Sequence, residues 1–373
     1  MRLTGARVFD PQAGFVERDL CIEGGKIVPD AGDPIAAADC FLIPGLTDLH
    51  FHGCRGADFS DGDPQGLETM AAYELSRGVT QICPAGMTLA AEQLLTICQT
   101  AAAHRAAGKP GAELVGVNLE GPFLSEAKKG AQNGAWLQKP NLPQLEALIE
   151  ASQGLVKLVS VAPELEGALD FIREASRRVT VSVAHTTANY DTALAAFQAG
   201  AREVTHLYNA MPPFAHRDPG VVGAAADSPE VYCELICDGI HIHPAVVRAT
   251  FRLMGRERMV LISDTMRAAG MPDGDYTLGG QAVRVQGKLA TLADGTIAGS
   301  VTDLMSCMRT AVSFGIPLED AVTAAAVNPA RVLGIYDRVG SLDAGKDANV
   351  AVLDRNLELK AVLFRGQTVF GGL

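Results

Sequence analysis

The chain has 373 residues, of which 48% are hydrophobic and only 5% aromatic, and its formal net charge is −12. Such a composition is typical of a folded α/β protein rather than a disordered chain, and the length suits one large barrel with a small accessory domain. The acidic balance argues against nucleic acid or an anionic membrane as the main partner. Eight cysteines without a CxxC pair, no apolar leader-like segment and no membrane-spanning stretch predict a reduced, cytoplasmic protein.

The two ends of the chain are predicted to be β-structure. Residues 1–44 alternate apolar and polar residues between the turn segments PQAG and EGG, and the C-terminal segment DANVAVLDRNLELKAVLFRGQTVF has the same pattern. Each piece is too small to fold alone. We therefore expect residues 1–44 and 341–373 to pair into one small β-sandwich.

Between them, residues 45–340 alternate strand and helix patterns. The helix segments AAEQLLTICQTAAAHRAAG, ALAAFQAG and PAVVRATFRLMG each end at a glycine. The strand segments are rich in Val, Ile and Leu: ELVGVNLE, LVKLVSVAPE, VTVSVAH, REVTHL, VYCELICDGI and RMVLISD. Regular alternation over this length favours an α/β fold of the (β/α)8 TIM-barrel type over an open doubly wound sheet, and no GxGxxG or P-loop motif follows any of the predicted strands.

The segment PGLTDLHFHG carries two histidines at a predicted strand end. Because side chains alternate with period two along a strand, His50 and His52 are expected on the same side, where both can reach one metal ion. Hydrogen bonding of both rings to loops is the alternative.

Other polar side chains also follow apolar strands, where a barrel places its chemistry. Glu120, His185 and His206 each end such a strand and together supply the three protein ligands of a catalytic metal; a cap, an ion pair or a core histidine is the alternative for each alone. Asp264 ends VLISD and is suited to proton transfer, or to capping. His241 ends a further strand, and the loop residue Arg217 is either an anion contact or simply solvated.

Taken together, LEGPF, KKGAQN, AHTTA, THLYNAMPPF, SDTMRAAG and NPARVLG resemble the N-acetylglucosamine-6-phosphate deacetylases, a family of the amidohydrolase superfamily. The resemblance runs over nearly the whole chain. It implies a (β/α)8 barrel with a small β-sandwich, a divalent metal, hydrolysis of the acetamide of a phosphorylated amino sugar, and a homodimer. It also implies roles for the matching residues: metal ligands Glu120, His185 and His206, acid/base Asp264, and substrate contacts Asn209, Ala210, Arg217, His241 and the loop Ile297–Ser300.

Two features separate members of the family. Some lack the HxH pair and bind one metal, so a second ion held by His50 and His52 is predicted here, with zinc as the expected metal and Fe²⁺, Mn²⁺ or Co²⁺ as alternatives. The family also has a histidine before the asparagine of KKGxHN, where this chain has Gln132. A glutamine amide can donate a hydrogen bond to a substrate carbonyl but carries no positive charge.

The predicted activity is therefore metal-dependent release of acetate from N-acetyl-D-glucosamine 6-phosphate. Its nearest alternatives are the galacto epimer or an unphosphorylated N-acyl amine. A dihydroorotase-type or hydantoinase-type reaction is disfavoured, because no lysine stands at a predicted strand end. A binding protein without catalysis is disfavoured as well, because the metal-ligand and acid/base residues are all present.

Overall fold

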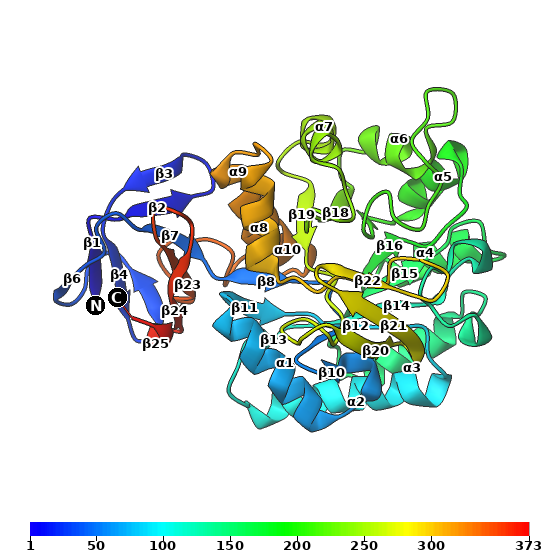
Figure 1. Ribbon diagram of the computed structural model, residues 1–373, viewed down its shortest axis with the longest axis horizontal. Helices are drawn as coiled ribbons and strands as arrows, with labels where there is room; N and C mark the ends of the chain where they lie inside the picture. The colour runs from blue at the N-terminus through cyan, green and yellow to red at the C-terminus, as the bar shows by residue number, and fades with distance from the viewer. Residues whose placement is uncertain (373) are drawn as a thin grey trace.

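The computed structural model describes residues 1–372 and contains two bodies of structure (Figure 1). The first is formed by strands from both ends of the chain, which lie side by side. Its six-stranded sheet has the order β25-β24-β23-β7-β2-β3, and its four-stranded sheet has the order β5-β4-β1-β6. The strands are β1 (Arg2–Thr4), β2 (Arg7–Asp10), β3 (Gly14–Glu17), β4 (Leu20–Glu23), β5 (Lys26–Val28), β6 (Pro34–Ala36), β7 (Phe41–Pro44), β23 (Val350–Leu353), β24 (Leu359–Phe364) and β25 (Gln367–Gly371).

The pairing of the two chain ends agrees with the sequence-based prediction. Strand β7 pairs antiparallel with β23, with Leu42 opposite Val352. Leu3, Leu20 and Ile22 of the four-stranded sheet share one buried apolar cluster with residues of the six-stranded sheet. The division of the chain at residues 44/45 and 340/341 stays a prediction.

The second body is a barrel of parallel strands. Its strands are β8 (Leu46–Asp48), β11 (Val79–Ile82), β12 (Ala85–Gly86), β13 (Glu113–Leu114), β14 (Val117–Phe123), β15 (Val156–Val161), β16 (Thr180–Val183), β17 (Glu203–Val204), β18 (Tyr232–Ile236) and β19 (Met259–Ile262). Strands β11 and β12 are successive parts of one strand of the barrel, and β13 and β14 are successive parts of the next. Counted in this way, the barrel has eight strands. It closes just beyond β19 and β8, where the Asp264 amide donates to the His50 carbonyl at 2.9 Å and the His52 amide donates to the Thr265 carbonyl at 2.7 Å. The predicted TIM-type barrel and all six predicted strand segments are confirmed.

Helices cover the outside of the barrel (Figure 1). They are α1 (Pro64–Ser76), α2 (Ala91–Ala107), α3 (Leu142–Ala151), α4 (Ala168–Ala175), α5 (Tyr190–Ala199), α6 (Gly220–Ala226), α7 (Pro244–Met254), α8 (Leu304–Ser313), α9 (Leu318–Val322) and α10 (Asn328–Val332), with a π-helical turn at Thr323–Val327 and 3₁₀ turns at Phe59–Asp61, Glu126–Lys128 and Gly134–Trp136. Helix α2 stops at Gly108, whose φ of 58° is a left-handed conformation that glycine adopts without strain. Helices α5 and α7 end at Gly200 and Gly255, as the sequence predicted.

One part of the fold was not predicted. A three-stranded antiparallel sheet follows the last barrel strand, formed by β20 (Gly274–Leu278), β21 (Gln281–Gln286) and β22 (Leu289–Thr291). The Gln281 side chain donates to the main-chain carbonyls of Ala131 and Gln132, which lie in the loop after β14. A short pair, β9 (Gly53–Cys54) and β10 (Ala57–Asp58), follows the first barrel strand. These additions extend the wall of the barrel at its C-terminal mouth.

Candidate metal and substrate site

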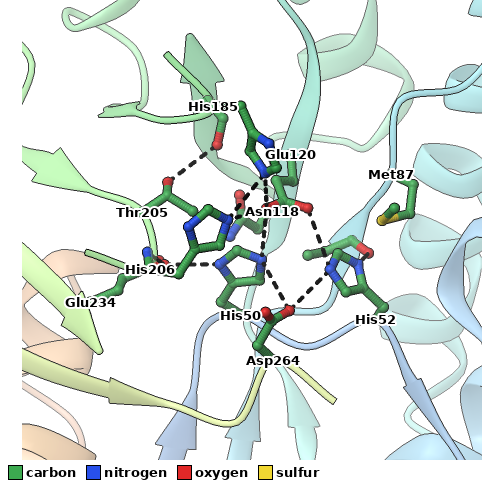
Figure 2. Close-up of polar contacts among 12 residues, drawn as sticks. His50, His52, Met87, Asn118, Glu120, His185, Thr205, His206, Glu234 and Asp264 are labelled. Atoms are coloured by element: carbon green, nitrogen blue, oxygen red, sulfur yellow. Dashed lines mark hydrogen bonds and ion pairs between the residues drawn. The ribbon is translucent and has the colours of Figure 1, made fainter. Parts of the chain in front are cut away.

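The C-terminal strand ends bring the six predicted metal-site and acid/base side chains together (Figure 2). The donor atoms form two groups, and within each group all of them lie within 4.8 Å of one another. The groups are His50, His52 and Asp264, and Glu120, His185 and His206. Every member is at most 7% exposed. His50 and His52 lie beyond the end of β8 rather than within it, so loop geometry and not strand alternation turns both rings inward.

Hydrogen bonds fix the protonation of three of the histidine rings. Nδ1 of His50 lies 2.9 Å from a Glu234 carboxylate oxygen, Nδ1 of His52 lies 3.1 Å from the Ala85 carbonyl, and Nδ1 of His185 lies 2.8 Å from the Lys128 carbonyl. These oxygens only accept hydrogen bonds, so each Nδ1 must carry the proton. In the neutral form of each ring, Nε2 then presents its lone pair, which is the arrangement of a metal-binding histidine.

Those lone pairs are directed at carboxylates. Glu120 Oε1 lies 2.9 Å from His206 Nε2, 3.1 Å from His185 Nε2 and 3.5 Å from His50 Nε2. Its other oxygen lies 3.4 Å from His52 Nε2, so Glu120 borders both groups. A lone pair facing an anion is repulsive unless a cation lies between them. The donor set of imidazole nitrogens and carboxylate oxygens therefore fits a divalent metal site.

Asp264 completes the group around the HxH pair. Its Oδ1 is 3.2 Å from His52 Nε2 and 3.8 Å from His50 Nε2, and this buried oxygen has no hydrogen-bond partner within the described residues. Burial acts to raise the pKa of the Asp264 carboxyl, but the adjoining His52 and His50 rings, which are positive when protonated, outweigh it and lower the pKa below its ordinary value. Asp264 is thus an ionised carboxylate at the mouth, available to accept a proton.

The backbone at the site is strained. His185, His206 and Asp264 have φ values of 42°, 27° and 48°, and Tyr208 and Ala210 have φ values of 79° and 52°. Non-glycine residues rarely adopt this left-handed region, and such conformations cluster where function requires them. The left-handed conformation accompanies the His185, His206 and Asp264 side chains at the centre of the mouth, whereas the Tyr208 hydroxyl lies 2.7 Å from Thr250 of helix α7.

Gln132 lies against Glu120 and is almost fully buried. Its Oε1 accepts from the Thr88 amide at 2.7 Å, which fixes the amide orientation, and its Nε2 donates to Glu120 Oε2 at 2.6 Å. Its remaining N–H points toward the Met87 sulfur at 3.6 Å. In this structure the amide therefore orients Glu120 at the edge of the substrate cavity.

A cavity of about 390 Å³ opens over the two groups. Asn209, Ala210, His241 and Ile297 line it, together with Gln132. His241 Nδ1 pairs with Asp238 at 2.8 Å, which leaves the other ring nitrogen for a ligand. Arg217 does not line this cavity: it is exposed, and its guanidinium lies 2.8 Å from the ring of His216.

The sequence interpretation missed two polar contributors. Lys128 is the one lysine or arginine among the described residues that line the cavity. The KKGAQN segment contains it, but nothing in its spacing separates Lys128 from Lys129. Glu234 was missed within VYCELICDGI, although a carboxylate inside an apolar strand is costly to bury without a partner and is itself a signal.

Comparison with known proteins agrees with this geometry. The amidohydrolase family model matches residues 41–369. The chain is 37% identical to the N-acetylglucosamine-6-phosphate deacetylase of Bacillus subtilis (strain 168), over 90% of this chain and 86% of that protein. It is 35% identical to the N-acetylgalactosamine-6-phosphate deacetylase of Escherichia coli O157:H7, over 98% of each chain.

Among solved structures, a mutant N-acetyl-D-glucosamine-6-phosphate deacetylase from Mycobacterium smegmatis, in complex with N-acetyl-D-glucosamine-6-phosphate, superposes with a TM-score of 0.93. It is 34% identical to this chain, and the match covers 99% of both. The chain therefore belongs to the amidohydrolase family and, within it, to the N-acetylglucosamine-6-phosphate deacetylases.

Proposed function

We propose that this protein hydrolyses the N-acetyl group of N-acetyl-D-glucosamine 6-phosphate, releasing acetate and glucosamine 6-phosphate in amino-sugar catabolism and recycling. The observation that carries the proposal is the cluster in which histidine lone pairs converge on Glu120 beside the ionised Asp264. The relatives that match over nearly the full chain support the same substrate class.

In this proposal Glu120, His185 and His206 would hold one divalent ion, and His50 and His52, with Asp264 beside them, would hold a second. Zinc is the proposed metal, because mixed imidazole and carboxylate ligands are common at catalytic zinc. A bound divalent ion supplies Lewis acidity, which lowers the pKa of water toward about 7 and polarises a carbonyl.

The chain's own residues then move the proton and hold the sugar. Asp264 accepts a proton from the attacking water and delivers it to the amine nitrogen as the C–N bond breaks. Asn209, His241, Ile297 and the backbone at Ala210 enclose the sugar. Gln132 contributes by holding Glu120, and Lys128 supplies positive charge in the cavity.

The galacto epimer is the second candidate. The E. coli relative that acts on N-acetylgalactosamine 6-phosphate matches this chain over 98% of both lengths. Gln132, in place of the family's histidine, is the local feature that favours a change of sugar.

Measuring acetate release by the zinc-loaded protein tests both candidates. Four substrates are compared: N-acetylglucosamine 6-phosphate, its galacto epimer and the two unphosphorylated sugars. We expect the highest kcat/KM with N-acetylglucosamine 6-phosphate and much lower values without phosphate. A higher kcat/KM for the galacto epimer would select the second candidate, and no acetate from either phosphorylated sugar would overturn the proposal.

We also propose a cytoplasmic homodimer. An apolar groove beside the Arg217 loop exposes Phe214, Val246 and Leu253, and large exposed apolar surface of this kind is typical of a protein interface. We propose that the exposed Arg217 of one copy contacts the substrate phosphate in the other. No helix in the described residues combines the length and apolarity needed to cross a membrane. Light scattering of the purified protein tests the dimer, and a monomeric mass at working concentration would contradict it.

A further inference from the structure

Glu234 is a fully buried carboxylate in the middle of barrel strand β18. It is 0% exposed and lies between the apolar residues Cys233 and Leu235. A carboxylate buried among apolar residues destabilises the fold unless a partner compensates its charge. Within the described residues its ion-pair partner is His50, and no lysine or arginine pairs with it.

One oxygen of Glu234 contacts both ligand groups. Its Oε2 accepts a hydrogen bond from His50 Nδ1 at 2.9 Å and another from the main-chain amide of His206 at 2.9 Å. His50 belongs to one group and His206 to the other. Figure 2 shows Glu234 beside both residues, on the side away from Glu120.

The first contact determines which ring nitrogen of His50 carries the proton, and the second holds the backbone of His206. The contact with His50 keeps the proton on Nδ1, so that its Nε2 lone pair faces Glu120 and Asp264. The contact with His206 anchors a strained backbone, whose φ is 27°, and the neighbouring Leu207 amide donates to the Glu234 carbonyl at 2.9 Å. Nδ1 of the His206 ring has no hydrogen-bond partner within the described residues, so the ring depends on its backbone for orientation.

We propose that Glu234 is a positioning residue that couples the two metal sites, by presenting the His50 lone pair and by fixing the main chain of His206. The proposal rests on the proposed function, because it takes His50 and His206 to be metal ligands. Partners that orient metal-binding histidines typically contribute 10–100-fold to metal affinity.

The barrel interior offers a matched control in Glu203. It lies on the adjacent strand β17, it is also 0% exposed, and neither of its carboxylate oxygens has a hydrogen-bond partner within the described residues. Substitution there removes a buried carboxyl from the same interior without changing a histidine hydrogen bond. Comparing the two positions separates an effect on His50 and His206 from a general effect of removing a buried carboxyl.

The experiment uses Glu234→Gln, Glu234→Ala and the matching Glu203→Gln and Glu203→Ala proteins. Zinc affinity is measured by competition with a chromophoric chelator, and folding is checked by circular dichroism. Glu234→Gln should weaken at least one zinc site about tenfold and Glu234→Ala up to about 100-fold. Both Glu203 variants should bind zinc like the wild type. Excess zinc should restore most of the kcat that Glu234→Gln loses at limiting zinc.

Two results would overturn the inference: wild-type zinc affinity at both sites in folded Glu234→Gln protein, or equal weakening by Glu203→Gln. If Glu234→Ala does not fold, the comparison of Glu234→Gln with Glu203→Gln decides the inference by itself. Failure of the proposed function is measured separately on the wild type. A wild-type protein that releases no acetate refutes the proposed function, and one that releases acetate but binds no second zinc refutes only the second metal site, whatever the Glu234 variants do.

Discussion

The two ends of the barrel use charge in opposite ways. At the N-terminal end, Glu113 at the start of β13 pairs with Arg105 at 2.5 Å through one oxygen and with Arg338 at 2.8 Å through the other. Asp347 in turn pairs with Arg338 at 2.6 Å and with Lys26 at 2.7 Å. Every carboxylate in this network, which links the barrel to residues near the terminal sheets, faces a permanent cation.

At the C-terminal end the carboxylates face histidine lone pairs instead. Glu120 and Asp264 contact no lysine or arginine in the described residues, and His50 Nε2 and Asp264 Oδ1 lack hydrogen-bond partners. A network whose polar groups are all paired contributes to stability, whereas buried polar groups left unpaired within the protein are typical of a functional site. Changes at the mouth should therefore affect catalysis and metal binding, and changes at the N-terminal network should affect stability.

The largest effect is expected from Asp264→Asn. The amide keeps the shape of the side chain but cannot accept the proton, and general acid–base catalysis contributes roughly 10²–10⁴-fold. We expect kcat to fall by at least about 100-fold on that scale, with the melting temperature nearly unchanged. Steady-state acetate release checks this, and activity above about a tenth of the wild type would show that Asp264 is not the acid/base.

The next effect concerns the HxH pair. Replacing His50 and His52 together by asparagine should lower the zinc content from two ions per chain toward one. It should also reduce kcat by about 100-fold, since a Lewis acid contributes several kcal/mol. Atomic absorption on the dialysed protein measures the first and acetate release the second. Full activity in the double variant, with one zinc in the wild type, would make the histidine pair structural.

Arg217→Ala should change substrate binding rather than turnover. Losing a charge-assisted hydrogen bond costs about 1.5–3 kcal/mol, which corresponds to roughly a 10- to 100-fold rise in KM for the phosphorylated sugar. KM for the unphosphorylated sugar should change little. Because Arg217 lies outside the cavity of its own chain, the effect on KM requires the proposed dimer. Equal changes for both substrates would show that Arg217 does not contact the phosphate.

The smallest effect on activity is expected at the N-terminal network. Glu113→Gln should leave kcat unchanged and lower the free energy of unfolding by about 1–3 kcal/mol at pH 7. Burial acts to raise the pKa of the Glu113 carboxyl, but Arg338 and Arg105 outweigh it and lower the pKa. Its contribution is therefore present above the unfolded-state value of about 4.3 and is lost as the pH falls through the lower folded value.

Urea unfolding at pH 7 and at acidic pH measures this difference. The gap between wild type and Glu113→Gln should shrink as the pH falls below about 4. Glu166→Gln provides a control, because the Glu166 pair with Lys139 is exposed and surface pairs contribute little. A gap that stays constant with pH would show that the Glu113 charge is not what stabilises the fold.

The sequence was most informative where one local pattern determines one local structure. Apolar strands followed by Glu120, His185, His206 and Asp264 predicted both the barrel and the converging side chains. Helix ends at glycine were equally clear. Contacts between segments far apart in the chain could not be predicted in this way. The amide orientation of Gln132 depends on a hydrogen bond from the Thr88 main chain. The hydrogen bond between His50 and Glu234 joins residues that are 184 positions apart. The β20–β22 sheet was missed because its short strands carry few apolar residues.

The most direct test of the account is an anomalous-scattering map of a zinc-loaded crystal. The account predicts two zinc peaks at the mouth of the barrel, one among Glu120, His185 and His206 and one among His50, His52 and Asp264, with Glu120 beside both. It also predicts no zinc at the N-terminal network around Glu113. A map without zinc at Glu120, His185 and His206, from protein that nevertheless releases acetate, would contradict the central claim.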